Sequence, residues 1–151
     1  MIELDLPDEA ATTALGGLIA RIEGPLKVYL SGDLGSGKTT LARALLQALG
    51  VQGRIKSPTY ALVEPYQIAS KSAYHIDLYR LNGTPRELEE LGLRELIFED
   101  GWLLLEWPER AQGFLPEPDL WIHLSPHQQG RRSQINGRQL IKLSYLINKP
   151  S

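Results

Sequence analysis

The chain has 151 residues and a formal net charge of −2, and it contains no cysteine. This length fits one domain, and the charge excludes a protein whose main feature is a basic nucleic-acid coat. Without cysteine there can be no disulfide, thiolate metal site or cysteine nucleophile. The apolar runs, such as Leu103–Leu105, are far shorter than the roughly 20 residues of a membrane helix, and the acidic start does not resemble a signal peptide. We therefore expect a single domain over residues 1–151, in the cytoplasm and without membrane contact.

The first third of the sequence predicts two strands, each followed by a helix. Alternating apolar and polar residues indicate a strand over 2–6. A helix follows, with Asp8 as its N-cap and the Gly-Pro pair at 24–25 as its end. A strand at 26–31 then leads into a glycine-rich turn, and a segment rich in Leu and Ala predicts a helix over 38–49.

The rest of the chain adds four more predicted strands and a short helix. A proline-containing loop and an extended segment precede a strand at 73–79, and a helix follows at 85–92. The nearly continuous apolar segment 101–107 is typical of a strand buried on both faces. Two further strands, 119–125 and 138–146, flank a polar loop and suggest a closing hairpin. Together these elements predict an α/β fold with a mainly parallel sheet, flanking helices and a C-terminal antiparallel hairpin.

The sharpest motif is GDLGSGKT at Gly32–Thr39, which fits the pattern G-x-x-x-x-G-K-[ST] between a predicted strand and a predicted helix. Glycines let the backbone amides curl around a polyphosphate, and the start of the helix adds further amides. Lys38 supplies a positive charge for the β- and γ-phosphates, and the Thr39 hydroxyl is a ligand that Mg²⁺ accepts. The predicted nucleotide contacts in this segment are Asp33, Leu34, Gly35, Ser36, Gly37, Lys38, Thr39 and Thr40.

Two carboxylates follow strand-like segments and are candidates for the chemistry of a bound triphosphate. Glu106 comes directly after the apolar residues 102–105, and Asp77 ends the segment that begins at Tyr74. One of them could orient Mg²⁺ through water while the other positions the attacking water, and the sequence leaves open which does which. For Asp77 there is also a structural alternative, in which it caps a turn or pairs with Arg80.

Three further features each allow two interpretations. The tripeptide at 57–59 lies where nucleotide switches carry a hydroxyl that senses the γ-phosphate, here that of Thr59, but it also fits a loop interrupted by proline. His75 is equally compatible with a structural and a catalytic role. Arg131, Arg132 and Arg138 form either a solvated loop or a contact with an acidic partner or RNA phosphates.

Four segments, in their order and spacing, resemble the TsaE family of ATPases of tRNA threonylcarbamoyladenosine biosynthesis. They are GDLGSGKTT (32–40), SPTY (57–60), HIDLYRL (75–81) and LLLEWPER (103–110). The resemblance implies one P-loop NTPase domain that binds ATP and Mg²⁺ and has weak ATPase activity dependent on TsaB and TsaD. It also implies a role in modifying the adenosine beside the tRNA anticodon, in which ATP turnover resets the modifying complex and any contact with tRNA is indirect.

The resemblance also implies roles for individual residues. The family's tryptophan beside the nucleotide corresponds to Trp107, and Tyr60 departs slightly from the family pattern, in which phenylalanine is common. The chain after residue 126 matches the pattern poorly. The remaining carried-over roles are phosphate and metal binding for Lys38 and Thr39, the switch hydroxyl for Thr59, the essential acid for Asp77, and the second acid near Mg²⁺ for Glu106.

Three other functions use a similar phosphate loop. A small-molecule kinase would need a second substrate pocket, for which the sequence shows no signature. A GTPase would carry a D-x-x-G motif after the phosphate loop, and the sequence has none there. A non-catalytic subunit that binds nucleotide to stabilise an interface needs the same pocket as a partner-activated ATPase, so the sequence does not separate these two.

Overall fold

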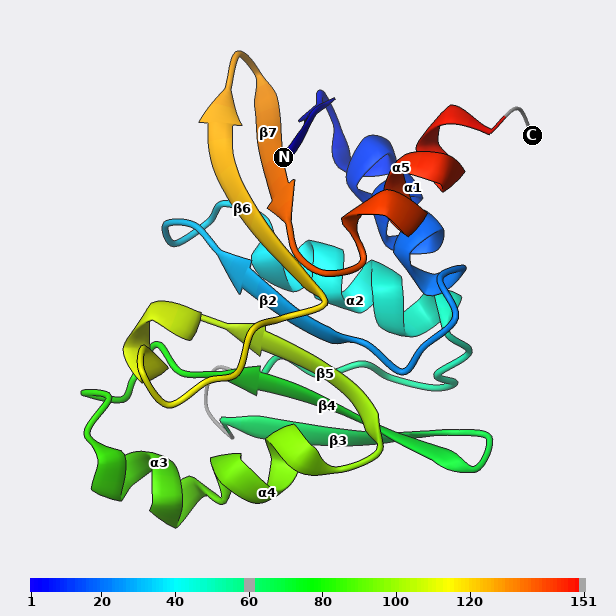
Figure 1. Ribbon diagram of the computed structural model, residues 1–151. Helices are drawn as coiled ribbons and strands as arrows, with labels where there is room; N and C mark the ends of the chain where they lie inside the picture. The colour runs from blue at the N-terminus through cyan, green and yellow to red at the C-terminus, as the bar shows by residue number, and fades with distance from the viewer. Residues whose placement is uncertain (59–61, 150–151) are drawn as a thin grey trace.

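The computed structural model describes residues 1–58 and 62–149 and has one sheet with helices on both faces, as an α/β fold requires (Figure 1). Asp8 caps the first helix as predicted, since its side chain accepts a hydrogen bond from the amide of Ala11 at 2.9 Å. The elements are β1 (Ile2–Leu6), α1 (Glu9–Ala20), β2 (Lys27–Ser31), α2 (Lys38–Ala48), β3 (Val63–Ile68), β4 (Lys71–Asp77), α3 (Pro85–Leu91), α4 (Leu93–Phe98), β5 (Gly101–Glu106), the 3₁₀ helix η1 (Pro108–Ala111), β6 (Leu120–His127), β7 (Gly130–Asn136) and α5 (Leu140–Asn148).

The sheet has seven strands in the order β1-β7-β6-β2-β5-β4-β3. Its four central strands, β6, β2, β5 and β4, are parallel neighbours, whereas β7, β1 and β3 are added by antiparallel pairing at the two sides. The predicted parallel centre and C-terminal antiparallel hairpin are therefore confirmed. Because the central strands are parallel, their carboxyl ends meet at one edge of the sheet, where ligands bind in open α/β folds.

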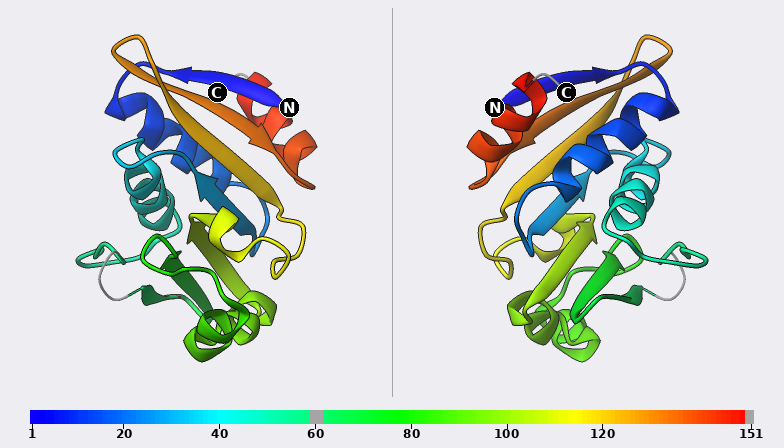
Figure 2. Two further views of the ribbon diagram at one scale, coloured as in Figure 1. Left: turned by 90° about the vertical axis from the view of Figure 1, so that its left-hand side faces the viewer. Right: turned by 90° about the vertical axis from the view of Figure 1, so that its right-hand side faces the viewer.

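Two hydrophobic cores lie on opposite faces of the sheet. Helices α1, α2 and α5 cover one face, and α3 and α4 cover the other (Figure 2). Strand β5 is buried along its whole length because Leu104 faces the α2 side while Leu103 and Leu105 face the α3–α4 side. The same alternation places Glu106 on the α2 side, and in β4 it places Asp77 there too.

The predicted strand at 138–146 is wrong: this segment begins helix α5, and strand β7 lies inside the segment expected to be a polar loop. The hairpin turns at Gln128, which has a φ of 54°, and β7 then pairs with both β6 and β1. Polar side chains are tolerated in β7 because only alternate residues, such as Ser133 and Ile135, are fully buried. In α5 the apolar residues recur at helical spacing, so that Leu140 and Leu143 pack on the first core.

Two smaller differences concern the segments around β4. The strand begins at Lys71 and ends at Asp77, two residues earlier at each end than predicted, and the short helix α4 was not predicted. Gly92 ends α3 with a φ of 80° and also begins α4, so one glycine separates two short helices. None of the helices in the described part of the chain is long and apolar enough to cross a membrane.

Candidate nucleotide site

The phosphate loop connects the end of β2 to the start of α2, as the sequence predicts. Gly32 has a φ of 137°, and a Cβ there would lie 2.4 Å from the carbonyl oxygen of Leu124. Gly37 precedes the helix with a φ of 103°, and within the described chain no side chain caps this helix start. The first-turn amides of α2 are therefore available to an anion, which the positive end of the helix also favours.

Lys38 lies against the loop with only 5% of its surface exposed. Its Nζ donates hydrogen bonds to the carbonyl oxygens of Gly32 at 2.5 Å and Asp33 at 2.9 Å. Burial lowers the pKa of Lys38, and the nearby carboxylates of Glu106 and Asp77 oppose that shift. The ammonium group is thus held at the inner wall of the loop by neutral carbonyl oxygens. A bound phosphate would give it an anionic partner.

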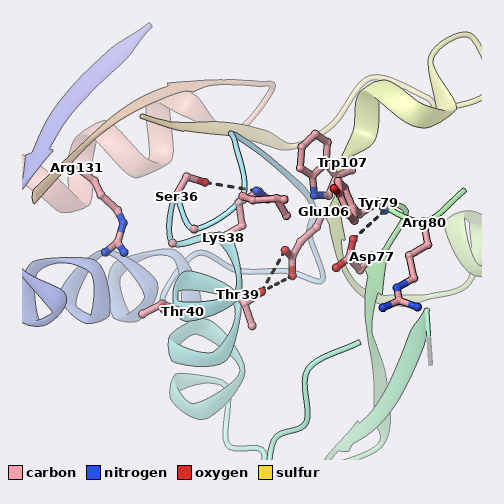
Figure 3. Close-up of a pocket in the computed structure, with 13 residues that line it drawn as sticks. Ser36, Lys38, Thr39, Thr40, Asp77, Tyr79, Arg80, Glu106, Trp107 and Arg131 are labelled. Carbon is pink, nitrogen blue, oxygen red and sulfur yellow. Dashed lines mark hydrogen bonds between the residues drawn. The ribbon is translucent and has the colours of Figure 1, made fainter. Parts of the chain in front are cut away.

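The side chains of Thr39 and Glu106 point toward each other at the start of α2 (Figure 3). The Thr39 hydroxyl donates to both carboxylate oxygens of Glu106, with distances of 3.2 and 3.1 Å, and Glu106 is only 2% exposed. Since the hydroxyl hydrogen is used in this contact, the hydroxyl lone pairs are left for a cation.

This pair of oxygen groups fits Mg²⁺, which takes one or two protein oxygens and fills its shell with water and phosphate oxygens. Residues 1–58 and 62–149 contain no group of three or more His, Cys, Asp or Glu side chains that could hold a metal ion. A cation at this place would accordingly depend on the phosphates of a bound nucleotide for the rest of its ligands.

Asp77 stands beside Glu106, because the two residues are direct partners in the β4–β5 ladder. One of its oxygens, Oδ1, accepts a hydrogen bond from the amide of Tyr79 at 2.9 Å, so Asp77 caps a turn as the structural alternative proposed. It also lines the cleft, which the functional alternative requires. Burial is the main reason that the pKa of Asp77 is raised, and the charge of Glu106 raises it further.

The loop and the two carboxylates enclose a cleft of about 310 Å³ (Figure 3). Asp33 reaches Lys38 through its backbone carbonyl and is not part of the cleft wall. Thr59 lies outside the described residues. Tyr79, Arg80 and Arg131 line the cleft without having been predicted to contact nucleotide. The predicted residues that the structure brings together are Leu34, Gly35, Ser36, Gly37, Lys38, Thr39, Thr40, Asp77, Glu106 and Trp107.

Comparison with known proteins gives the same picture over most of the chain. The family model described as "Threonylcarbamoyl adenosine biosynthesis protein TsaE" matches residues 6–134. The chain belongs to the TsaE family. A Haemophilus influenzae relative named tRNA threonylcarbamoyladenosine biosynthesis protein TsaE is 46% identical over 136 residues, which is 86% of this chain and 85% of the relative. A Bacillus subtilis protein of the same name is 36% identical and covers 77% of this chain and 71% of its own length.

A solved structure extends the likeness to three dimensions. The crystal structure of Bacillus subtilis YdiB superposes with a TM-score of 0.79 at 26% identity, covering 97% of this chain and 93% of that one. The P-loop fold of this TsaE-family chain is therefore shared with a solved protein along nearly its whole length.

An aromatic wall closes one side of the TsaE-family cleft. Trp107 has a φ of 62°, an unfavourable value for a bulky residue, and such strained backbone is concentrated at functional sites. Its ring lies 4.6 Å from Nζ of Lys38 and 5.0 Å, between centroids, from the ring of Tyr79. Trp107 was predicted beside the nucleotide, whereas Tyr79 was missed although it stands in the HIDLYRL segment.

Arg131 reaches the phosphate loop from β7. A Cβ built on Gly37 would lie 2.7 Å from Nε of Arg131, so this side chain packs directly on the loop. Arg132 points to the other face of the strand, where its guanidinium hydrogen-bonds Asp5 and His127 at 3.1 Å each. The third arginine of this set, Arg138, donates to Asp119 at 3.0 Å, so the three arginines have different surroundings.

We expect Arg131→Ala to weaken ATP binding by roughly 10- to 100-fold, because one charge-assisted hydrogen bond to phosphate contributes about 1.5–3 kcal/mol. Arg132→Ala is the matched control, since it removes the same charge from the adjacent residue on the opposite face of β7. Isothermal calorimetry with a nonhydrolysable ATP analogue measures both. Equal affinities for the two variants would show that Arg131 takes no part in nucleotide binding.

Proposed function

We propose that this TsaE-family chain binds ATP with Mg²⁺ in the cleft and hydrolyses it in support of tRNA threonylcarbamoyladenosine modification. The observation that supports the hydrolytic site most directly is the contact between the Thr39 hydroxyl and the Glu106 carboxylate beside Lys38. The role in tRNA modification rests on the family and on the names of the relatives.

The phosphate loop and Lys38 hold the β- and γ-phosphates. The loop amides and the first-turn amides of α2 donate to phosphate oxygens, and Lys38 exchanges its carbonyl partners for phosphate. Thr39 and Glu106 would hold Mg²⁺, which neutralises charge on the phosphates when it is bound. Trp107 and Arg131 limit the movement of the nucleotide from two sides of the loop.

Asp77 is the group that accepts a proton from the attacking water. The water oxygen forms a bond to the γ-phosphorus while the bond from that phosphorus to the β–γ bridging oxygen breaks, and the electron pair of the broken bond stays on ADP. The water proton passes to the Asp77 carboxylate, whose raised pKa makes it a stronger base than an exposed aspartate. The hydroxyl of Thr59 is proposed as the group that senses the γ-phosphate.

The proposed partners are TsaB and TsaD, which carry out the threonylcarbamoyl transfer, and ATP turnover resets their complex between cycles. The large apolar side chain of Leu34 projects from the rim of the cleft and is 65% exposed. A partner that covers this residue would close the cleft and exclude bulk water from the phosphates. Without the partner the cleft stays open, and we therefore propose that the isolated chain has low activity. Any contact with tRNA is proposed to be indirect, through these partners.

Phosphate release from ATP, measured with and without TsaB and TsaD, tests this function. We expect slow release by the chain alone and a clear increase with both partners. Unchanged turnover, together with ATP-dependent association, would favour a non-catalytic nucleotide-gated subunit. Transfer of the γ-phosphate to a nucleoside or metabolite, detected by mass spectrometry, would favour a small-molecule kinase.

A further inference from the structure

His75 is a buried histidine on β4 that lies two residues before Asp77 on the same face of the strand. It is 1% exposed, and its Nε2 lies 2.6 Å from Oε2 of Glu106. The other ring nitrogen, Nδ1, is buried as well and has no hydrogen-bond partner among the described residues. Among the described residues, Glu106 is therefore the one hydrogen-bond partner of the ring.

The two ring nitrogens are not equivalent in this environment. A carboxylate only accepts hydrogen bonds, so the short contact requires the proton to be on Nε2. An N–H on the unpartnered Nδ1 would be a buried donor without an acceptor, which is costlier than a buried lone pair. The geometry thus favours the tautomer in which His75 donates from Nε2 and leaves Nδ1 unprotonated.

Glu106 is consequently held between two donors. His75 donates to Oε2 from β4, and the Thr39 hydroxyl donates to both carboxylate oxygens from α2. Asp77, its neighbour in the ladder, is oriented differently because Oδ1 accepts from the amide of Tyr79. The two adjacent carboxylates therefore have separate sets of partners.

We infer that His75 is a positioning residue that directs the Glu106 carboxylate toward Thr39 and thereby leaves Asp77 for the attacking water. This inference rests on the proposed function and deepens it, since it assigns different roles to the two carboxylates. Hydrogen bonds to ligating carboxylates from the surrounding protein orient them, and removing such a partner commonly weakens metal binding. Among the described residues, His75 is not one of those that line the cleft, so it acts through Glu106.

Two amide variants distinguish the positions of the two ring nitrogens. In His75→Gln the side-chain NH₂ can stand near the place of Nε2 and donate to Glu106. In His75→Asn the shorter side chain brings its NH₂ near the place of Nδ1, where the described residues offer no acceptor. The two variants are chemically alike, so a difference between them reports on the hydrogen bond to Glu106 rather than on the loss of an aromatic ring.

The readout is the affinity for a nonhydrolysable ATP analogue, measured by calorimetry with Mg²⁺ and again with EDTA. The ratio of the two affinities reports how well the site holds the ion. We expect His75→Asn to lower this ratio by roughly 10-fold or more and His75→Gln to keep it within about 3-fold of the unsubstituted protein. The affinity in EDTA should remain unchanged in both variants, because the phosphate loop is intact.

Nitrogen-15 NMR of the unsubstituted protein gives a second test that needs no variant. The chain has three histidines, so the ring signals can be assigned, and His75 should show a protonated Nε2 and an unprotonated Nδ1. A protonated Nδ1 with an unprotonated Nε2 would overturn the inference even if His75→Asn failed to fold.

The outcomes also separate this inference from the proposed function. If the unsubstituted protein binds the analogue equally well with Mg²⁺ and with EDTA, the proposed magnesium site itself is wrong. If it prefers Mg²⁺ and His75→Asn has the same preference, only the positioning role of His75 is wrong. A His75→Gln variant no better than His75→Asn would likewise reject the hydrogen bond as the cause.

Discussion

Replacing Lys38 with alanine will weaken ATP binding by about 100-fold or more, because the phosphates lose the buried ammonium group that lies on the inner wall of the loop. Lys38 is the loop side chain whose charge is already oriented by the carbonyl groups of Gly32 and Asp33. A buried cation interacts strongly with phosphate because little water screens the pair. Calorimetry with a nonhydrolysable ATP analogue, in the presence of Mg²⁺, measures the effect.

Lys27 offers a matched control for this experiment. Its ammonium group also donates to two backbone carbonyls, those of Glu99 and Gly101, at 2.8 Å each, and burial also lowers its pKa. It lies at the start of β2, whereas the phosphate loop follows the end of that strand. Lys27→Ala should therefore leave ATP affinity unchanged. If Lys38→Ala binds the analogue as well as Lys27→Ala does, the nucleotide site is not where we place it.

Glu106→Gln and Asp77→Asn should each reduce ATP turnover by about 100-fold or more, measured with the proposed partners TsaB and TsaD, because the proposed proton transfer and metal binding each need a carboxylate. Nucleotide binding should persist in both, since the loop amides and Lys38 are unchanged. Only Glu106→Gln should also raise the Mg²⁺ concentration needed for half-maximal binding. Turnover close to that of the unsubstituted protein in both variants would refute the roles assigned to these residues.

Thermal unfolding across pH provides the folding control for Asp77→Asn. Because burial raises the pKa of Asp77 in the folded chain, ionisation of this residue lowers the stability of the fold. The effect is absent below the ordinary pKa of aspartate, grows as the pH rises and is complete above the raised pKa. At neutral pH, Asp77→Asn should therefore unfold at the same temperature as the unsubstituted protein or a higher one, and the difference should vanish near about pH 3. An unfolding temperature well below that of the unsubstituted protein at neutral pH would mean that lost turnover reflects lost structure.

The phosphate loop could be predicted because its conformation is determined locally. The glycines, the lysine and the threonine are contiguous, and the strand before them and the helix after them are visible as short-range patterns. The position of Glu106 was predictable for a similar reason, since a fully buried strand such as β5 is an apolar run and the residue after such a run lies at the edge of the sheet. Asp77 could be proposed from the end of β4, but only as one of two acids with unassigned roles.

Contacts between distant segments decided the features of the fold and of the site that the sequence did not predict. The strand predicted at 138–146 was wrong because short apolar segments fit both helix and strand. Packing against α1 selects the helix in this segment. Strands β1 and β6 pair with β7 instead. Arg131 reaches Gly37, and His75 reaches Glu106, across separations of many residues that no local pattern encodes. The sequence by itself determined where we propose that phosphate binds, because a loop of consecutive residues makes that candidate site. Only the tertiary structure decided how the two carboxylates are held and which arginine reaches the loop, because those choices depend on strand order and on the face to which each side chain points.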